Sequence, residues 1–266
     1  MSKSCIFCGR KGNKSKEHLW PEWMHEYLPY VGDGNHIRES NTFQWKTPVD
    51  EKKLKRQGQL FTTKFRVVCS DCNNGWMSRL EEAVKPMFLK MIRGEKVSLH
   101  KSDQELLSRW IAVKVIIGEH ADKGIHVTPR LDRSKLKEEN KIPEYFVIYI
   151  CSHDSQADTA WLRISNTLAL SAKGPNPPLG SMKRNTQSIA FICGRVFIFV
   201  FATREQDIDA AEFIKMKSLK QLWPQKIEII EWPTPKLVTE REMSKLAWAI
   251  DELDKYTTVS YGGDLP

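Results

Sequence analysis

The sequence predicts an α+β protein of two domains, at residues 1–95 and 96–266. In the first domain, two Cys-x-x-Cys pairs, Cys5–Cys8 and Cys69–Cys72, enclose a polar segment, and a strand-like run leads directly into the second pair. In the second domain, strand-like and helix-like runs are mixed and the net charge is near neutral. This mixture indicates an α+β domain there as well.

The N-terminal domain is expected to contain a strand and two helices around a long insertion. Residues 19–28 predict a short helix. Residues 31–60 are polar with little periodicity, which indicates either a long loop or a weak hairpin. The β-branched and aromatic run at residues 60–68 predicts a strand. Apolar residues at three- and four-residue steps predict a helix over residues 73–92, kinked or split by Pro86.

The second domain is expected to open with a helix over residues 103–118, which carries an apolar pattern of helical period. The apolar run at residues 188–202 is interrupted at Gly194, which predicts a hairpin with one or both faces buried. A capping-box pattern opens a helix over residues 239–256. The other expected elements are strands at residues 145–151 and 160–171, a loop at 173–181 and a helix at 207–222.

The composition is that of a globular protein, with 41% hydrophobic and 28% charged residues. No apolar run approaches the roughly 18 residues that a membrane span needs, so no membrane association is expected. The N-terminus shows no apolar stretch followed by a cleavage site, so we expect no signal peptide and a cytoplasmic location. In a reducing compartment, paired cysteines favour metal or redox chemistry over disulfides.

Positive charge is concentrated in the N-terminal part of the chain. Residues 1–100 contain 18 Lys and Arg against 11 Asp and Glu, a net charge of +7, whereas the remaining residues contribute +1 of the total of +8. A polyanion such as DNA or RNA is attracted to such a segment. Lysines that simply face solvent would give the same excess.

The two cysteine pairs supply four soft thiolates, which is the ligand set of a structural Zn²⁺ ion. Sixty residues separate Cys8 from Cys69, so the segment between the pairs must fold back to bring them together. Iron–sulfur binding and two unrelated pairs of reduced thiols are alternatives. The other two cysteines, Cys151 and Cys193, lie in strand-like apolar runs and are interpreted as small buried hydrophobic residues.

Three polar residues near the cysteines are of the types that hold a hard cation and activate a water. Glu17 offers a carboxylate oxygen to Mg²⁺ or a similar ion, and His18 can act as a general base because its ordinary pKa lies near neutrality. Neighbours on a strand point to opposite faces, so the two need a local bend to share a site. Asn73 offers a side-chain carbonyl at the start of a helix. Capping and packing would explain the same residues.

Together, these elements resemble the HNH endonuclease family, whose ββα-metal fold places a two-stranded hairpin and a helix around one divalent cation. The segments that carry the resemblance are Cys5-Ile-Phe-Cys8, Glu17-His18 and Cys69-Ser-Asp-Cys72-Asn73. The chain also looks like a bacterial subgroup with a Glu-His-x-Trp-Pro-x-Trp stretch and a Cys-Asn-x-Gly-Trp helix start. The resemblance covers about residues 4–92 and does not extend further.

The resemblance implies a role for each residue. His18 would deprotonate the attacking water, and Glu17 and Asn73 would hold a catalytic Mg²⁺ or Mn²⁺ at the scissile phosphate. The four cysteines would hold a structural zinc. The family usually has a middle asparagine about five residues before the second cysteine pair, where this chain has Lys64. Asn41, in the insertion, is a candidate substitute.

The expected function is therefore a metal-dependent endonuclease that hydrolyses phosphodiester bonds in DNA. The alternative is a non-catalytic, zinc-stabilised protein that binds nucleic acid, and a third interpretation is a zinc-stabilised protein-interaction domain. Residues 96–266 carry no motif that points to a role. Choice of the target, binding of a protein partner, formation of a homo-oligomer and sensing of a signal are all compatible with them.

Overall fold

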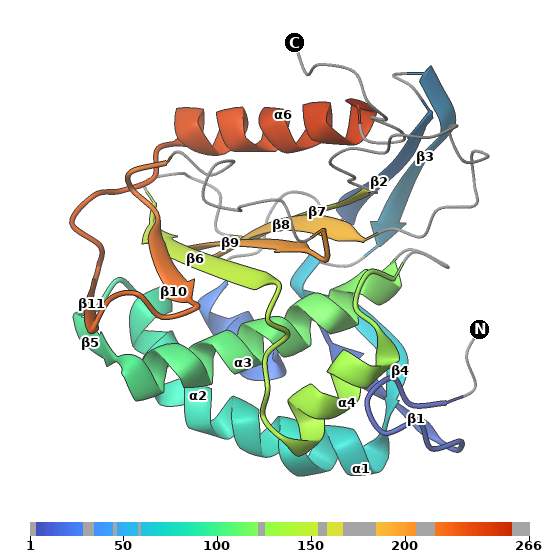
Figure 1. Cartoon of the computed structure of the whole chain (residues 1–266), viewed down its shortest axis with the longest axis horizontal. Helices are drawn as coiled ribbons and strands as arrows, with labels where there is room; N and C mark the ends of the chain where they lie inside the picture. The colour runs from blue at the N-terminus through green and yellow to red at the C-terminus, as the bar shows by residue number, and fades with distance from the viewer. Residues whose placement is uncertain are drawn as a thin grey trace.

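The computed structural model describes residues 4–28, 35–44, 47–57, 60–121, 126–153, 159–166, 185–205 and 216–256. Helices and antiparallel sheets make up these ranges, which confirms the α+β class (Figure 1). None of the helices in these ranges is long and apolar enough to cross a membrane. The loop predicted at residues 173–181 lies outside the described residues.

The largest sheet has five antiparallel strands in the order β10-β6-β9-β8-β7. These strands are β6 (Phe146–Ser152), β7 (Thr159–Asn166), β8 (Thr186–Cys193), β9 (Val196–Thr203) and β10 (Lys220–Trp223). β8 and β9 form the predicted hairpin, and Gly194 at its turn has a φ of +54°, a left-handed value that glycine adopts without strain.

Helices cover both faces of this sheet (Figure 1). α3 (Lys101–Gly118) packs against one face with α2 (Ser78–Ile92) behind it, and α6 (Glu240–Tyr256) lies over the other face. Residues of β9 alternate between two cores. The even-numbered residues from Ile198 to Ala202 belong to the core on the α3 side, and the odd-numbered residues from Phe197 to Phe201 belong to the core on the α6 side. This alternation explains why the predicted hairpin is apolar throughout.

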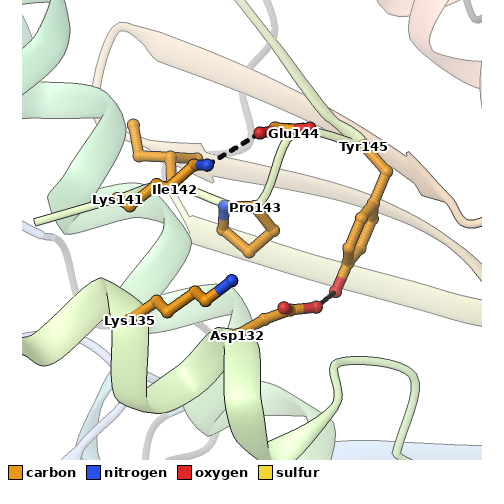
Figure 2. Close-up of a pocket in the computed structure, with 7 residues that line it drawn as sticks. All are labelled: Asp132, Lys135, Lys141, Ile142, Pro143, Glu144 and Tyr145. Carbon is orange, nitrogen blue, oxygen red and sulfur yellow. Dashed lines mark hydrogen bonds and ion pairs between the residues drawn. The ribbon is translucent and has the colours of Figure 1, made fainter. Parts of the chain in front are cut away.

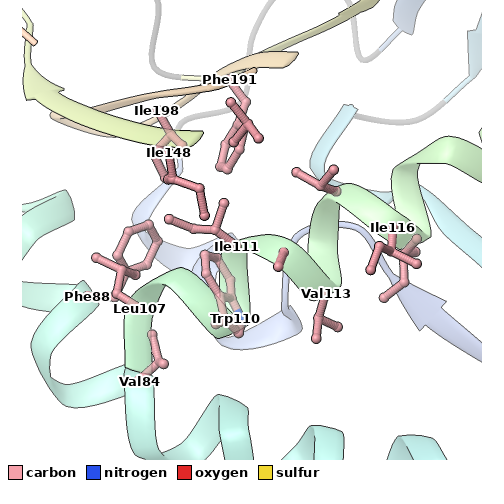
Figure 3. Close-up of a cluster of buried hydrophobic side chains, with 14 of the residues drawn as sticks. Val84, Phe88, Leu107, Trp110, Ile111, Val113, Ile116, Ile148, Phe191 and Ile198 are labelled. Carbon is pink, nitrogen blue, oxygen red and sulfur yellow. The ribbon is translucent and has the colours of Figure 1, made fainter. Parts of the chain in front are cut away.

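α3 is buried along most of its length because it lies between α2 and the sheet (Figure 3). Phe88 of α2 packs on Trp110, with ring centroids 4.9 Å apart. Ile148 and Phe191, from strands β6 and β8, point toward Ile111 from the other side. The helix predicted over residues 103–118 is therefore confirmed and forms the centre of the larger core.

The N-terminal elements form a two-stranded sheet followed by a helix. β1 (Lys14–His18) pairs antiparallel with β4 (Lys64–Cys69). β4 leads into a helical turn, α1 (Ser70–Cys72), a π-helical turn, η3 (Asn73–Met77), and then α2. The helix predicted after the second cysteine pair is thus confirmed, but Pro86 lies inside α2 and does not split it; the non-helical residue is Gly75, in the π-helical turn before it.

The polar insertion forms a hairpin of β2 (Asn35–Gln44) and β3 (Thr47–Gln57), one of the two alternatives that the sequence left open. The short helix predicted at residues 19–28 is a 3-10 helix, η1 (Glu22–Tyr27). The strand predicted at residues 60–68 is confirmed only from Lys64 on, because its first residues form a 3-10 turn, η2 (Leu60–Thr62). The other elements were not predicted and are short: β5 (Val97–His100), η4 (Glu119–Ala121), α4 (Arg130–Glu138) and β11 (Ile229–Trp232).

One predicted helix is wrong where the structure describes it. The helix expected over residues 207–222 ends in a segment that forms strand β10 instead, because Lys220–Trp223 completes the edge of the five-stranded sheet beside β6. Residues 206–215 lie outside the described part of the chain.

A single hydrophobic cluster extends across the domain boundary expected at residue 95. It includes Phe7 and Trp20 from the N-terminal part together with Leu107 and Ile148 from the later part. Trp20 Nε1 also lies 2.9 Å from the sulfur of Cys193, at the turn end of β8. The cysteine-containing region is therefore packed directly on α3, and the division into domains stays a prediction.

Candidate metal centre and the polar site beside it

The fold brings the two cysteine pairs together. The sulfur atoms of Cys5, Cys8, Cys69 and Cys72 all lie within 4.8 Å of one another. Four sulfurs around one zinc at about 2.3 Å would be roughly 3.8 Å apart, and the Cys8 and Cys69 sulfurs are separated by 3.6 Å. The cluster can therefore hold a metal ion such as zinc. Cys151 and Cys193 are buried elsewhere, as expected.

Backbone hydrogen bonds shape the first cysteine turn. Gly9 has a φ of +73° and its N–H donates to the carbonyl of Cys5 over 2.9 Å. Ile6 N–H donates to Val67 of β4 over 3.0 Å, which attaches the turn to the strand that leads to the second pair. An exposed ion pair of 2.9 Å between Arg10 and Asp71 joins the two pairs on the outside.

The surroundings act differently on the thiols of the cluster: burial raises the pKa of Cys69 and Cys72, whereas the pKa of Cys5 is lowered. Burial acts to raise the pKa of the Cys5 thiol, but backbone hydrogen bonds from Cys8 and Cys69 outweigh it and lower this pKa to about 7. Two arginines of α4 add positive charge. Arg130 covers Gly9 so closely that a methyl group there would collide with its guanidinium. Burial lowers the pKa of Arg133, and the charge of a Cys5 thiolate is among the groups that act to raise it. A zinc with four thiolates carries two net negative charges, which these cations stabilise.

Glu17, on the strand that pairs with β4, is bound by a lysine. The Nζ atom of Lys114, in the middle of α3, lies 2.7 Å from Oε1 of Glu17 and 2.6 Å from Oε1 of Glu81. The same ammonium donates to the backbone carbonyl of His18 over 3.2 Å. Glu17 is 6% exposed and Lys114 is 2% exposed. We call Glu17, Lys114 and Glu81 the buried triad.

The buried triad contains two carboxylates for one ammonium. Burial raises the pKa of Glu17, and the attraction of Lys114 only partly offsets it. For Lys114, burial opposes the charged form, but the two carboxylates outweigh burial and raise the pKa. Lys114 is therefore charged at neutral pH, and the ionised triad has one net negative charge, with the Glu81 side chain 25% exposed.

His18 faces a different group of residues. Its ring lies 5.6 Å from that of His25 in an edge-on arrangement, and His25 lies 5.0 Å from Phe61. The Nε2 atoms of His18 and His25 are both buried without a hydrogen-bond partner in the part of the chain that the structure describes. Two unpartnered imidazole nitrogens in one small region are unusual in a folded protein. They mark a place where a water, a cation or a substrate oxygen would gain hydrogen bonds or coordination.

Lys64 stands directly opposite His18 in the β1–β4 pair. Burial lowers the pKa of His18, and the charge of Lys64 lowers it further. The residue that replaces the usual middle asparagine therefore helps to keep the imidazole neutral, which is the form that accepts a proton.

The structure does not place all the predicted site residues together. The register of β1 shifts between Ser15 and Glu17, and the side chains of Glu17 and His18 contact different partners. Asn73 opens the π-helical turn directly after Cys72 and is half-buried. Its role as a metal ligand stays a prediction.

The donor set decides how well a second cation would fit. Among the described residues, only the four cysteines form a group of three or more potential metal ligands. Lys114 occupies Oε1 of Glu17, and if that contact opened, Lys114 would keep Glu81 as a partner. The oxygens of Glu17 and Asn73 suit Mg²⁺ or Mn²⁺, and these residues remain the ones that would hold such an ion.

A small pocket beside the end of α4 is not a competing site (Figure 2). Its volume is about 160 Å³, below the roughly 300 Å³ of ordinary ligand pockets. Three of the four charged side chains that line it have partners: Lys141 lies 2.8 Å from Glu144, and the hydroxyl of Tyr145 donates to Asp132 over 2.9 Å.

Sequence reasoning missed three residues of this region, namely Lys114, Glu81 and His25. Lys114 carried a signal, because it is the one charged residue between Trp110 and Gly118 in an otherwise apolar helical run. Glu81 and His25 resemble ordinary surface residues in the sequence. Comparisons of the chain with family models, with curated proteins and with solved structures gave no match.

Proposed function

We propose that this protein is a metal-dependent endonuclease that hydrolyses phosphodiester bonds in DNA, with an active site of the HNH type. The observation that supports the proposal best is the buried, unpartnered Nε2 atom of His18, at the end of the strand pair that leads to the four-cysteine cluster. A neutral imidazole with an unmet acceptor nitrogen is what a general base requires. The resemblance of residues 4–92 to HNH endonucleases supplies the reaction class.

In this proposal, His18 takes the proton of the attacking water at Nε2. Burial and Lys64 keep the imidazole neutral at physiological pH, so the base is ready before the substrate arrives. A divalent cation, when bound by Glu17 and Asn73, would supply charge stabilisation at the phosphate and at the leaving 3′ oxygen. The metal held by the four cysteines has a structural role, because four protein ligands leave no open position.

Lys114 controls the position of Glu17 and of the end of β1 in this proposal. The ammonium holds Glu17 and the backbone carbonyl of His18 at once, so it fixes the end of β1. We infer that Glu17 is exchanged between Lys114 and the cation, while Glu81 retains Lys114. Lys114 is accordingly a positioning residue and not a catalytic one.

One observation favours the second candidate function, a zinc-stabilised protein that binds nucleic acid without cutting it. The carboxylate of Glu17 is engaged by Lys114 at 2.7 Å. A chain in which this ion pair never opens would keep Oε1 of Glu17 from the catalytic cation, yet would keep the cysteine cluster and the basic N-terminal segment.

Replacing His18 with alanine tests the proposal. With Mg²⁺ or Mn²⁺ present, we expect the cleavage rate of DNA to fall by about 10²–10⁴, the usual contribution of a general base. Rates on single- and double-stranded DNA and on RNA should be measured in parallel with Lys16→Ala, which alters an exposed residue of the same strand.

The control should cut within a few-fold of the parent rate, and His18→Ala should keep the metal content and melting temperature of the parent. A parent protein that cuts none of these substrates, or a His18→Ala variant that cuts as fast as the parent, would contradict a catalytic role. Binding of DNA that persists in that case would select the second candidate.

A further inference from the structure

Two exposed cations of β4 lie on the face of the β1–β4 pair that points away from the core. Phe65 and Val67 of this strand pack against the hydrophobic cluster, whereas Lys64 and Arg66, which alternate with them, are exposed. Neighbouring residues on a strand point to opposite faces, so Lys64 and Arg66 share the outer face. We call Lys64 and Arg66 the outer cations.

The strand register brings the outer cations to His18. Lys64 stands directly opposite His18, and opposite residues of an antiparallel pair have Cβ atoms about 4.5–5.5 Å apart. Arg66 follows two positions further along β4, a step of roughly 6.8 Å. Lys16 of β1 is also exposed, but it lies at the register shift of that strand, so the pairing does not assign it to this face. Two cations therefore lie on one side of the proposed general base.

The charge of the outer cations is not neutralised within the described part of the chain, where neither of them forms an ion pair. Arg10, which is also exposed, has Asp71 at 2.9 Å. The only acidic residue of β1 and β4 is Glu17, which is 6% exposed and bound on the α3 side. Glu22 is close enough to act on His18, but it forms no ion pair with the outer cations. Their charge is therefore available to an anionic ligand.

We propose that Lys64 and Arg66 bind the phosphate groups of double-stranded DNA that flank the bond at His18. The inference rests on the proposed function, because it takes DNA as the substrate class and His18 as the base. It goes further by assigning the residues that hold the DNA strand. The residue that stands in place of the usual middle asparagine thereby becomes a substrate-binding residue.

The chemistry of the two side chains fits this role. An ammonium binds phosphate oxygens as a point charge, and a guanidinium can hold two of them at once. Phosphate contacts fix the position of a nucleic acid without reading its sequence. With Lys64 and Arg66 on successive contacts, the DNA strand runs along β4 and past His18, whose Nε2 atom is buried without a partner among the described residues. The cations thus attract the substrate to the place where the base is needed.

Two matched pairs of substitutions test the inference. Lys64→Gln with Arg66→Gln removes the outer cations. Lys226→Gln with Arg241→Gln removes one lysine and one arginine that are likewise exposed, so the net charge changes equally. These distant cations lie between β10 and β11 and at the start of α6, segments that Figure 1 shows away from β1 and β4.

Each pair of substitutions is made in the His18→Ala chain, and binding to a DNA duplex is measured over a salt series without added divalent cation. For the outer cations, we expect the slope of log affinity against log salt to fall by about 1.8, and the affinity near 0.1 M salt to fall by roughly tenfold to a hundredfold. The distant pair should change both far less. Circular dichroism confirms that each variant is folded.

A charge-keeping variant separates charge from side-chain shape. Lys64→Arg with Arg66→Lys retains both cations and should retain the salt slope of the His18→Ala chain. Equal losses for the outer and the distant cations would overturn the inference, as would a charge-keeping variant that loses as much affinity as the glutamine variant. A parent chain that binds an RNA duplex but no DNA duplex would also overturn it.

The proposed function fails separately from this inference. If removal of the outer cations selectively weakens DNA binding by a chain that never cuts DNA, the phosphate contacts are supported and the nuclease is rejected. If the chain with His18 cuts DNA and both pairs of substitutions leave kcat/KM equally affected, the nuclease is supported and the assignment of Lys64 and Arg66 is rejected.

Discussion

A Cys69→Ser chain is expected to bind no zinc and to have an unfolded N-terminal region at room temperature. Cys69 ends β4, and its sulfur lies 3.6 Å from that of Cys8 in the four-cysteine cluster. A structural zinc contributes about 10–16 kcal/mol in small zinc-binding domains, and this binding energy is folding energy. This zinc-binding energy is as large as the whole stability of an ordinary domain, roughly 5–15 kcal/mol. Loss of one ligand is therefore expected to unfold the region around the cluster.

The measurements are the zinc content of the purified chain and its thermal unfolding. We expect about one zinc per chain in the parent and close to none in Cys69→Ser. Cys193→Ser is the matched control, because Cys193 is equally a free cysteine but lies outside the cluster, where a serine oxygen can still accept the hydrogen bond of Trp20. This control should keep its zinc. If Cys69→Ser also keeps one zinc and melts with the parent, the four cysteines do not form one site.

The sequence was a good guide where one residue type dictates the chemistry or where periodicity is long. The spacing of the cysteines predicted the cluster, and the apolar pattern of α3 predicted a helix, because each depends on local composition. The short strands β5 and β11 could not be predicted. They are held by pairing between residues about 130 positions apart, such as Ile229 with His100, and four-residue segments carry little periodicity of their own.

The strand β10 shows the same limit in another form. Residues 220–222 continue a helical pattern in the sequence, but the edge of the five-stranded sheet offers unpaired backbone groups to Lys220–Trp223. Pairing with β6 then outweighs the local helical preference. Whether a short segment with such a pattern forms a helix or a strand therefore depends on its tertiary contacts.

The polar site was predicted only in part for a related reason. Glu17 and His18 were identified by type, but the sequence could not reveal that Lys114, 97 residues away, binds the first of them. A buried lysine lowers the stability of a protein unless carboxylates pair with it. Its presence in α3 therefore indicates an acidic partner, but the sequence does not show which residue that partner is. The partners became visible only when β1 and α2 were packed on α3.

Replacing Lys114 with methionine is expected to destabilise the protein by about 3–5 kcal/mol, because it leaves the Glu17 carboxylate buried without its cation. Equilibrium unfolding in urea measures the effect. Lys141→Met is the matched control, since the Lys141–Glu144 pair has a similar length of 2.8 Å but both side chains are at least half exposed. An exposed pair contributes about 0–1 kcal/mol, so burial of the charges, and not the ion pair as such, accounts for the difference between the variants.

The pH dependence of this loss of stability tests whether the unpaired Glu17 carboxylate causes it. The pKa of Glu17 is raised in the folded protein, and removal of Lys114 raises it further, because the attraction that partly offset burial is gone. A carboxyl group with a raised folded-state pKa stabilises the fold below its unfolded pKa, near 4.3, and that stability is lost as the pH rises through the folded-state value. The difference in stability between Lys114→Met and the parent should therefore be smallest near pH 5 and largest near pH 8.

A second substitution separates charge from packing. Adding Glu17→Gln to Lys114→Met removes the buried carboxylate and should recover part of the lost stability, and it should also flatten the pH dependence, because the amide does not titrate. A loss that is independent of pH and unchanged by Glu17→Gln would mean that Lys114 acts through the packing of its side-chain carbons. In that case Glu17 is not held by an exchangeable ion pair, and the route by which a cation would replace Lys114 has no basis.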